Sequence, residues 1–342
     1  MKSKLVSRKM ITLFLFVAVL LFLKNAEAKR DIPDNNLAYP ALIIIDEHFS
    51  GSGFFYRSGS CLYFITARHV LFNAIFSVEL EKLPSKFKFP DHLKHRIFFN
   101  KGKKQLLFVG VMNTKEKQEL LKLSQDEIYF NNAIEKLFKL SQRIKLKGMT
   151  ATIISYSDKK DEPNVNEFQL NLEAFFRVDK ILYHPSYDIA AIRIGRIITK
   201  NGIRKIKIGK EIQPKSYSKI VCAREESIKK FDNVLVGNEV FIFGYPTSLS
   251  ISPHIGIKKP LLRKGIVAGK NKFLKTIILD CPAYPGNSGG LVIEIERIGV
   301  ANYNLSPIGI VSEYVPFYKK VTQNSGYSIV VPMDAVNELI SK

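Results

Sequence analysis

The sequence predicts an all-β protein built from antiparallel barrels or sandwiches. Short β-branched and aromatic runs recur along the chain, Gly, Pro and Asn turns separate them, and only two segments have helical spacing. The 342 residues are 46% hydrophobic and 24% charged, a balance that excludes disordered, collagen-like and coiled-coil classes. This length allows one large domain or two small ones.

Residues 1–28 have the pattern of a secretory signal peptide. A basic stretch over 2–9 precedes an apolar run over 10–23, which is too short for a hydrocarbon core of roughly 30 Å. Ala26-Glu27-Ala28 then supplies a small-x-small cleavage site. We expect cleavage after Ala28, a mature domain over 29–342, and export to the periplasm or the extracellular space. An uncleaved membrane anchor is the alternative.

The chain is strongly basic. Its formal net charge is +21, which falls to +17 when the signal peptide removes five basic residues and one acid. Such a charge attracts anionic surfaces. The basic residues are spread along the whole chain, as a compositional bias would also spread them, so no specific nucleic-acid partner is expected. An anionic surface stays open as a partner.

The mature chain starts with strands. A β-branched run covers 41–46, and 51–56 pairs with 62–66 as a hairpin through a Ser/Gly turn at 58–60. Further strands are expected at 168–176, 190–194, 240–243, 265–268, 276–279, 290–294, 308–311 and 327–331.

Two segments are predicted to be helical. Ser124-Gln125-Asp126-Glu127 is a capping-box pattern, and apolar residues follow it at near-helical spacing over 128–141. Near the C-terminus, Asp334 is expected to cap a short helix over about 334–340. The lysine-rich stretch 101–117 is expected to be a solvated loop.

The sharpest chemical signal is Pro285-Gly286-Asn287-Ser288-Gly289-Gly290. Flanking glycines let the chain turn tightly, which exposes the Ser288 hydroxyl and lets backbone N–H groups converge on a developing oxyanion. A serine needs a histidine to take its proton, and the histidine needs a carboxylate to fix its tautomer.

The order of residues along the chain limits the fold. Gly286-x-Ser288-x-Gly290 also matches the nucleophile elbow of α/β-hydrolases, whose acid and histidine follow the serine. That order is excluded, because all six histidines precede Ser288: His48, His69, His92, His95, His184 and His254. His69, just past a β-rich run, is the candidate base. Asp188, directly before an apolar strand, is the candidate acid, with Asp179 as a rival.

Three motifs in this order resemble those of trypsin-like serine proteases: Thr66-Ala67-Arg68-His69, His184-Pro185-x-x-Asp188-Ile189-Ala190 and the Ser288 motif. The chain is most similar to the bacterial HtrA-like (Do-like) branch without a PDZ domain. Gly51-Ser52-Gly53-Phe54, 240–246 ahead of 265–267, and 326–332 also match that branch. The resemblance covers residues 41–340, apart from an insertion.

The resemblance implies two packed six-stranded antiparallel β-barrels with the active site in the cleft between them. The N-terminal barrel would cover about 38–200 and the C-terminal barrel about 215–342. A partly helical insertion at about 85–165 accounts for the 119 positions between His69 and Asp188. It could be a lid, a partner surface or a tolerated surface excursion.

The resemblance also implies a serine endopeptidase that works through an acyl-enzyme intermediate. Ser288 would attack the peptide carbonyl, His69 would move the proton, and Asp188 would hold the imidazole. The N–H groups of Gly286 and Ser288 would form the oxyanion hole. Ser312 matches the strand that pairs with an extended peptide substrate.

Departures from the family pattern affect activation and specificity. Asn287 stands where trypsin-type zymogens have an aspartate that captures a new N-terminus, so that activation switch is absent. Pro282 stands at the base of the S1 pocket, which disfavours cutting after Lys or Arg. Tyr314, two residues after Ser312, would narrow the pocket mouth and favour a small or aliphatic P1 residue.

The other reactive residues point to no metal or cofactor. His92-x-x-His95 has loose metal-ligand spacing without a third candidate, and phosphate-loop, zinc-protease and calcium-loop motifs are absent from the sequence. Cys61 and Cys222 are expected as buried thiols and Cys281 in the pocket wall, with any pairing among the three left open.

Two further functions fit the same residues. One is a catalytically silent, protease-like protein that binds acidic partners through its positive surface. The other is an esterase that uses the same triad. All three triad positions are filled, which a decayed enzyme would not require, so the endopeptidase is the preferred hypothesis.

Overall fold

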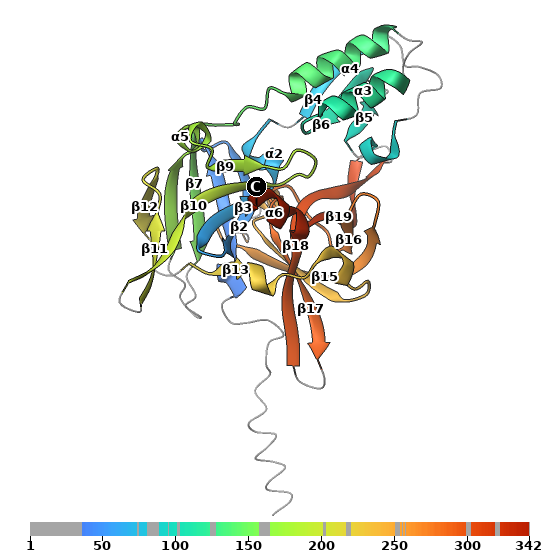
Figure 1. The fold of residues 1–342 in the computed structure, drawn as a ribbon. Coiled ribbons are helices and arrows are strands. Elements are labelled where there is room, and N and C mark those ends of the chain that lie inside the picture. The colour runs from blue at the N-terminus through green and yellow to red at the C-terminus, as the bar shows by residue number, and fades with distance from the viewer. Residues whose placement is uncertain are drawn as a thin grey trace, which may run out of the picture. The chain divides into compact units, whose positions relative to one another are not determined.

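Strands contain about half of the described residues and form two large β-structures, one after the other in the sequence (Figure 1). They are described by a computed structural model, in which all described residues belong to one compact unit. The described residues are 36–73, 75–80, 89–94, 96–100, 103–123, 128–156, 165–200, 203–216, 220–249, 254, 256, 258–298, 302–318 and 322–341. The predicted signal peptide and the capping box over 124–127 lie outside them.

The C-terminal half is a closed barrel of six strands, in which every neighbouring pair is antiparallel. Around the barrel the order is β14-β15-β16-β19-β18-β17. Apolar side chains that alternate along the strands fill the interior, among them Val240, Ile242 and Val292. The strands are β14 (Glu239–Gly244), β15 (Leu261–Asn271), β16 (Thr276–Asp280), β17 (Leu291–Ile298), β18 (Asn302–Tyr318) and β19 (Thr322–Pro332).

The N-terminal half is a ten-stranded sheet around its own apolar core. Its main path is β11-β10-β3-β2-β1-β7-β8-β12, while β9 pairs with β10 and β13 pairs with β2. The strands are β1 (Pro40–Ile45), β2 (Phe49–Ser58), β3 (Cys61–Thr66), β7 (Thr150–Tyr156), β8 (Val165–Asn171), β9 (Ile181–Tyr183), β10 (Ala190–Lys200), β11 (Ile203–Ile208), β12 (Ile212–Ser216) and β13 (Cys222–Arg224).

The all-β fold class is confirmed, but the N-terminal half differs from the expected six-stranded barrel. The two end strands of its path, β11 and β12, are not hydrogen-bonded to each other in the described part of the chain. A short turn over 209–211 connects β11 to β12 along the chain instead. Since β11 pairs with β10 and β12 pairs with β8, the two ends of the sheet are joined by the polypeptide and not by hydrogen bonds between strands. This half also extends to β13, beyond the expected boundary at about 200, because β13 pairs in parallel with β2.

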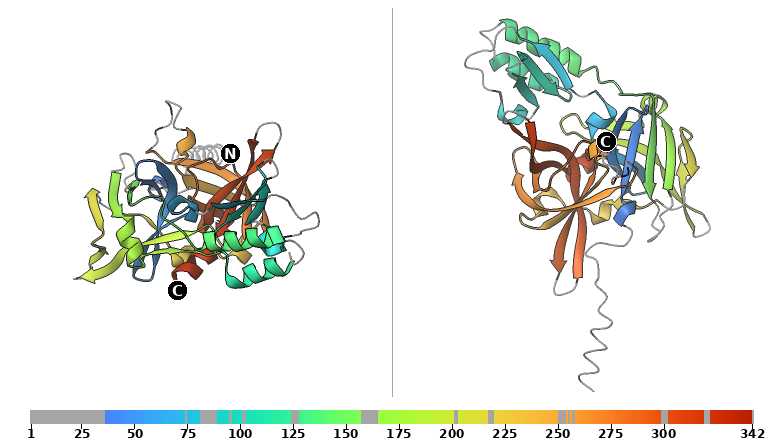
Figure 2. Two further views of the ribbon diagram at one scale, coloured as in Figure 1. Left: turned by 90° about the horizontal axis from the view of Figure 1, so that it is seen from above. Right: turned by 180° about the vertical axis from the view of Figure 1, so that it is seen from behind.

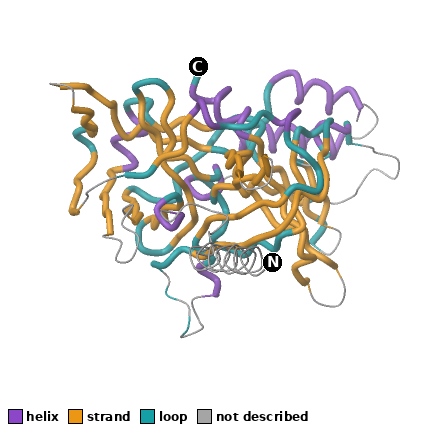
Figure 3. The backbone as a smooth tube through the Cα atoms, turned by 90° about the horizontal axis from the view of Figure 1, so that it is seen from below, coloured by secondary structure: helices purple, strands orange, loops and turns teal. Residues whose placement is uncertain are grey.

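A small α/β layer interrupts the N-terminal half. Its sheet has the order β4-β6-β5, and two helices pack along it with a separate apolar core that includes Phe108, Phe130 and Leu137 (Figure 2). These helices are the longest that the structure describes (Figure 3). The elements are β4 (Ile75–Glu79), β5 (Ile97–Asn100), β6 (Gln105–Val109), α3 (Thr114–Leu123) and α4 (Ile128–Ser141).

The layer corrects two expectations. It covers 75–141 rather than about 85–165, because β7 and β8 pair with β1 and with each other inside the main sheet. The stretch 101–117 is not a plain solvated loop, since it contains β6 and the start of α3. Leu106 and Phe108 alternate into the core there, which the surrounding lysines concealed.

Two local expectations were wrong because side chains compete for backbone groups. The strand expected over 168–176 ends at Asn171, whose side chain accepts a hydrogen bond from the Ala174 N–H at 2.9 Å and caps α5 (Leu172–Arg177). Asp334 does not cap α6 (Met333–Ile340). Its carboxylate accepts from the Phe231 N–H at 2.8 Å, which ties the C-terminal helix to the segment entering β14.

The remaining elements are short. They are α2 (Arg68–Leu71) and the 3₁₀ turns η1 (Asn36–Ala38), η2 (Asp91–Leu93), η3 (Glu225–Ser227), η4 (Phe231–Asn233) and η5 (Thr247–Leu249). None of the described helices has the length and apolar character needed to cross a bilayer.

Candidate active site

Two adjacent strands bring His69 and Asp188 together. His69 lies in the single turn α2 that follows β3, and Asp188 lies in the loop just before β10. Because β3 and β10 are antiparallel partners with Thr66 opposite Ala190, the end of one strand meets the start of the other. The sheet therefore places the two residues side by side despite their separation of 119 positions.

The Asp188 carboxylate accepts three hydrogen bonds. His69 Nδ1 lies 2.6 Å from Oδ2, and the His69 backbone N–H donates to Oδ1 at 2.9 Å. The Ser312 hydroxyl, on β18 of the other β-structure, donates to Oδ2 at 2.9 Å. Since a carboxylate only accepts, these bonds place the imidazole proton on Nδ1 and leave Nε2 as a base.

Electrostatics favour the ionised form of Asp188. Burial alone would raise its pKa, but the charge and hydrogen bonds of His69, together with the charge of Arg68, outweigh burial and lower it. The His69 pKa is raised: burial alone would lower it, and the charge and hydrogen bond of Asp188 prevail. Two further charges act on the imidazole, since Lys147 lowers its pKa and Glu313 raises it.

Ser288 lies in a tight turn between β16 and β17. The Asn287 N–H donates to the Tyr284 carbonyl and the Gly290 N–H to the Asn287 carbonyl, both at 2.8 Å. Glycine is required twice. Gly286 has φ +100° and Gly289 has φ +87°, and a Cβ on Gly289 would lie 2.1 Å from the Ser52 carbonyl oxygen.

Ser52, on β2 of the N-terminal half, fastens this turn. Its backbone N–H donates to the Ser288 carbonyl at 2.9 Å. Its buried hydroxyl donates to the Gly286 carbonyl at 2.6 Å and accepts from the Tyr245 N–H at 2.8 Å. Sequence reasoning placed Ser52 in a matching strand but assigned it no role, because its partners lie 193 and 234 positions away.

Ser288 is connected to the other two residues through Ser312. Its hydroxyl donates to the Ser312 carbonyl at 3.3 Å, while the Ser312 hydroxyl contacts Asp188. No hydrogen bond joins Ser288 Oγ to His69 within the described part of the chain. Of the three predicted residues, His69 and Asp188 are therefore in direct contact, and Ser288 reaches them through one intermediary.

The N–H groups of Gly286 and Ser288 have no hydrogen-bond acceptor among the described residues. The carbonyl of Pro285, which precedes Gly286, is held away because it accepts from the Ser248 N–H at 3.2 Å. Neither N–H is thus occupied by the protein at the position where the sequence predicts an oxyanion hole.

The predicted substrate-contacting residues lie on β18. Ser312 is the extra residue of a bulge, since Val311 pairs with Val330 and Glu313 pairs with Ile329. Tyr314 has 36% of its surface exposed. Glu313 lies between them as an exposed carboxylate, a residue that sequence reasoning did not single out.

The residues at the expected pocket base are held by an arginine. The Pro282 carbonyl accepts from Arg263 at 2.7 Å, and the Arg263 guanidinium stacks over the Tyr284 ring at 4.4 Å from its centroid. Cys281, expected in the pocket wall, is buried, and burial raises the pKa of its thiol to about 11.

The remaining candidates contribute no chemistry to this site. Cys61 and Cys222, expected as buried thiols, are each half-buried, and all three cysteines are free. His92 pairs with Glu119 at 3.2 Å, and His95 lies outside the described residues. The described part of the chain has no cluster of His, Cys, Asp and Glu able to hold a metal ion.

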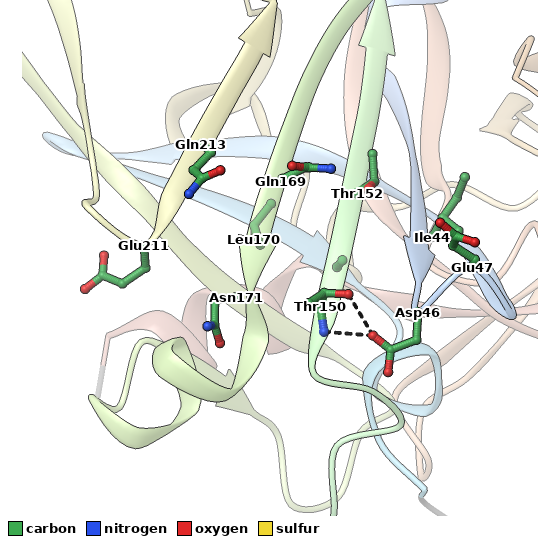
Figure 4. Close-up of a pocket in the computed structure, with 11 residues that line it drawn as sticks. Ile44, Asp46, Glu47, Thr150, Thr152, Gln169, Leu170, Asn171, Glu211 and Gln213 are labelled. Carbon is green, nitrogen blue, oxygen red and sulfur yellow. Dashed lines mark hydrogen bonds between the residues drawn. The ribbon is translucent and has the colours of Figure 1, made fainter.

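A separate hollow of about 290 Å³ lies over β1, β7, β8 and β12 (Figure 4). Asp46, one of its carboxylates, is already satisfied by the N–H and hydroxyl of Thr150, at 2.9 and 2.8 Å. The hollow contains none of the residues around His69 and Ser288, so it is not a substrate pocket for them.

Comparisons with known proteins place structural neighbours beside this geometry. No protein-family model matches the chain, and no curated protein sequence matches it either. Many solved structures match, and three of them have identities of 11–12%. They are an HtrA-type protease, AlgW, with tripeptide (TM-score 0.41), a serine endoprotease from Yersinia pestis (0.38) and Deg5 (0.39).

These structural neighbours are HtrA/Deg serine proteases. The matches cover 91%, 92% and 88% of this chain and 63%, 67% and 87% of theirs, in the same order. The chain thus spans less than two thirds of the AlgW chain.

Replacing Ser52 by Ala tests how strongly the two β-structures are fastened at the Ser288 turn. The change leaves the buried Tyr245 N–H without its acceptor, which costs about 1–3 kcal/mol. Urea unfolding should therefore show a lower midpoint with an unchanged slope. The control is Ser58→Ala on the same strand, whose hydroxyl makes an exposed bond to Glu225. Equal midpoints for the two variants would contradict the fastening.

Proposed function

We propose that the protein is an exported serine endopeptidase that cleaves peptide bonds through an acyl-enzyme intermediate. The observation that carries the proposal is the Asp188 carboxylate, which holds the His69 ring by Nδ1 beside a glycine-flanked serine turn. Such an arrangement turns a weakly nucleophilic hydroxyl into a reactive one, because the imidazole can take its proton as the bond to carbon forms.

The proposed reaction assigns one task to each group. Ser288 Oγ attacks the scissile carbonyl carbon while His69 Nε2 takes the hydroxyl proton, and Asp188 stabilises the resulting imidazolium. The N–H groups of Gly286 and Ser288 receive the negative charge that develops on the carbonyl oxygen. His69 then donates its proton to the leaving amine. Water repeats the sequence on the ester and releases the second product.

The Ser288 hydroxyl has to leave its present acceptor before it can donate to His69. Its present bond to the Ser312 carbonyl is 3.3 Å long and therefore weak. Catalytic hydrogen bonds are often long without substrate and tighten when it binds. An extended peptide could add to β18 near Ser312 and Tyr314 and donate an N–H to the Ser312 carbonyl. The Ser288 hydroxyl would then lose its present acceptor and could donate to His69.

Export is part of the proposal and rests on the signal-peptide pattern over 1–28. N-terminal sequencing of the protein from the natural host would test it. A mature chain that starts at Lys29 supports export with cleavage, whereas a retained Met1 contradicts it.

Replacing Ser288 by Ala should abolish peptidase activity. We expect a rate loss of roughly a millionfold, because no other hydroxyl occupies that position. A fluorophosphonate probe should label the parental protein at Ser288, as located by mass spectrometry, and should not label the variant. Ser58→Ala is the control and should keep both labelling and turnover.

Two outcomes would contradict this proposal. Parental turnover of a denatured protein by the Ser288→Ala variant would mean that another group is the nucleophile. No labelling or turnover by the parental protein, together with salt-sensitive binding to a polyanion, would favour a catalytically silent protein that binds acidic partners. Turnover of small esters without peptides would indicate an esterase.

Removing either of two charges near His69, those of Glu313 and Lys147, should shift the pH dependence of kcat/KM, in opposite directions. Turnover requires neutral His69, so the rate rises with pH as the imidazolium loses its proton. Glu313→Gln removes a negative charge that raises the His69 pKa, so the rise should move to lower pH. Lys147→Met removes a positive charge that lowers it, so the rise should move to higher pH.

The pH–rate profiles of the two variants, measured at one ionic strength with a neutral peptide, provide the check. Asp188 is the strongest of the charges that act on the pKa of His69, so each shift should be smaller than that caused by Asp188→Asn. Shifts in the same direction, or no shift in either variant, would contradict the assignment of His69 as the base.

A further inference from the structure

Among the described residues, one buried charge near the site donates no hydrogen bond to the proposed catalytic residues. Arg68, immediately before His69, is 1% exposed. Buried arginines usually pair with carboxylates. Arg68 forms no ion pair with a described carboxylate. It uses Nη1 to donate to two backbone carbonyls, those of His184 at 2.5 Å and Pro185 at 2.9 Å.

The His184 and Pro185 carbonyls lie at the start of the loop that contains Asp188. Within the loop, His184 Nδ1 accepts from the N–H groups of Ser186 and Tyr187 at 3.1 and 2.9 Å. The His184 N–H donates to the Ile189 carbonyl at 2.9 Å. The loop is therefore closed internally by His184 and fixed to α2 by Arg68. The single turn α2 thus carries both the His69 imidazole and the Arg68 guanidinium, which fixes the loop that contains Asp188.

The α/β layer contacts the same guanidinium from another side. Gly110, at the end of β6, has φ +101°, and a Cβ there would lie 2.5 Å from Arg68 Nη2. The next residue, Val111, donates its N–H to the Pro185 carbonyl at 3.4 Å. Arg68 and the Asp188 loop are thus both in contact with the end of β6.

That end of β6 is itself held firmly. Arg96, 3% exposed, pairs with Glu116 of α3 at 2.6 Å. The same guanidinium donates to the carbonyls of Val109 and Val111 on both sides of Gly110. A displacement of α3 relative to the sheet would therefore reach Gly110 through Arg96.

We propose that Arg68 is a positioning residue that aligns Asp188 with His69, and that the α/β layer acts on this alignment through Gly110. This inference rests on the proposed peptidase function for its kinetic consequence. Its structural consequence, the state of the His69–Asp188 hydrogen bond, can be measured whether or not the protein turns over peptides. The insertion is then neither a simple lid nor a tolerated excursion but a layer in contact with the catalytic acid's loop.

Arg68→Lys tests the positioning role. Lysine keeps the charge but is a compact point donor that cannot match the geometry of a planar guanidinium between two carbonyls. We expect kcat to fall on the order of 100-fold with KM nearly unchanged, because the misplaced group is in the reaction and not in substrate binding. The far-downfield proton resonance of His69 Nδ1–H should broaden or move upfield. An unchanged resonance and kcat would overturn the proposal.

Gly110→Ala tests the connection to the α/β layer without removing any charge. Its matched control is Gly237→Ala, since Gly237 has φ +93° and its Cβ would meet nothing within 4 Å. Both variants carry similar backbone strain, and Gly110→Ala adds the close contact with Arg68, so its melting temperature should fall at least as far as that of Gly237→Ala. Only Gly110→Ala should lower kcat and alter the His69 resonance.

The outcomes separate this proposal from the proposed function. If the two glycine variants have the same resonance and the same kcat, the layer does not act through Arg68. If the resonance responds in Gly110→Ala but the parental protein neither labels nor turns over, the positioning role stands and the peptidase function fails. If Arg68→Lys does not fold, the glycine pair alone decides.

Discussion

The hydrogen bonds to the Asp188 carboxylate are the constraint on which the site depends. A carboxylate with 16% of its side chain exposed stays ionised only if hydrogen bonds and positive charge replace the water it has lost. Asp188 obtains hydrogen bonds from His69 in the N-terminal half and from Ser312 on β18, and its positive charge from His69 and Arg68. Its hydrogen-bond partners come from both β-structures. The carboxylate therefore has all of them only when the two β-structures are packed together.

The Ser288 turn depends on a second set of long-range bonds. Ser52 reaches into it with its N–H and its hydroxyl, and Gly289 packs so closely on the Ser52 carbonyl that any side chain would be excluded. The turn is consequently held by a strand of the other half and not by its own loop alone. Ser288 is presented by a rigid scaffold, which is what proximity and orientation in catalysis require.

Sequence reasoning reached the parts of this protein that local chemistry determines. The tight turn around Ser288 could be predicted because a serine flanked by turn glycines has a short sequence pattern. His69 and Asp188 could be found because each lies at the edge of a recognisable strand. The strand pattern left barrels and sandwiches open, and the closed C-terminal barrel was implied by the family resemblance. Neither predicted that β11 and β12 would be the two ends of the N-terminal sheet, unpaired with each other in the described part of the chain.

The rest depended on contacts that no local pattern reveals. Arg68 looked like one more basic residue in a chain of net charge +21, and only the fold shows it buried against two carbonyls. The Asp334 side chain could have accepted from an N–H of α6 or from the Phe231 N–H, and the tertiary structure brings it to Phe231. The helix over 128–141 was predicted, but the sheet of the α/β layer was missed because lysines surround its core strand β6.

We propose that His69, Asp188 and Ser288 act as one catalytic unit. Turnover of the three single Ala variants and of the triple variant tests it most directly. Residues that act together lose nearly everything when one is removed. We expect the turnover rate of Ser288→Ala and that of His69→Ala each to fall about as far as the rate of the triple variant. Losses that multiply across the three positions, so that the triple variant is far slower than any single one, would contradict it.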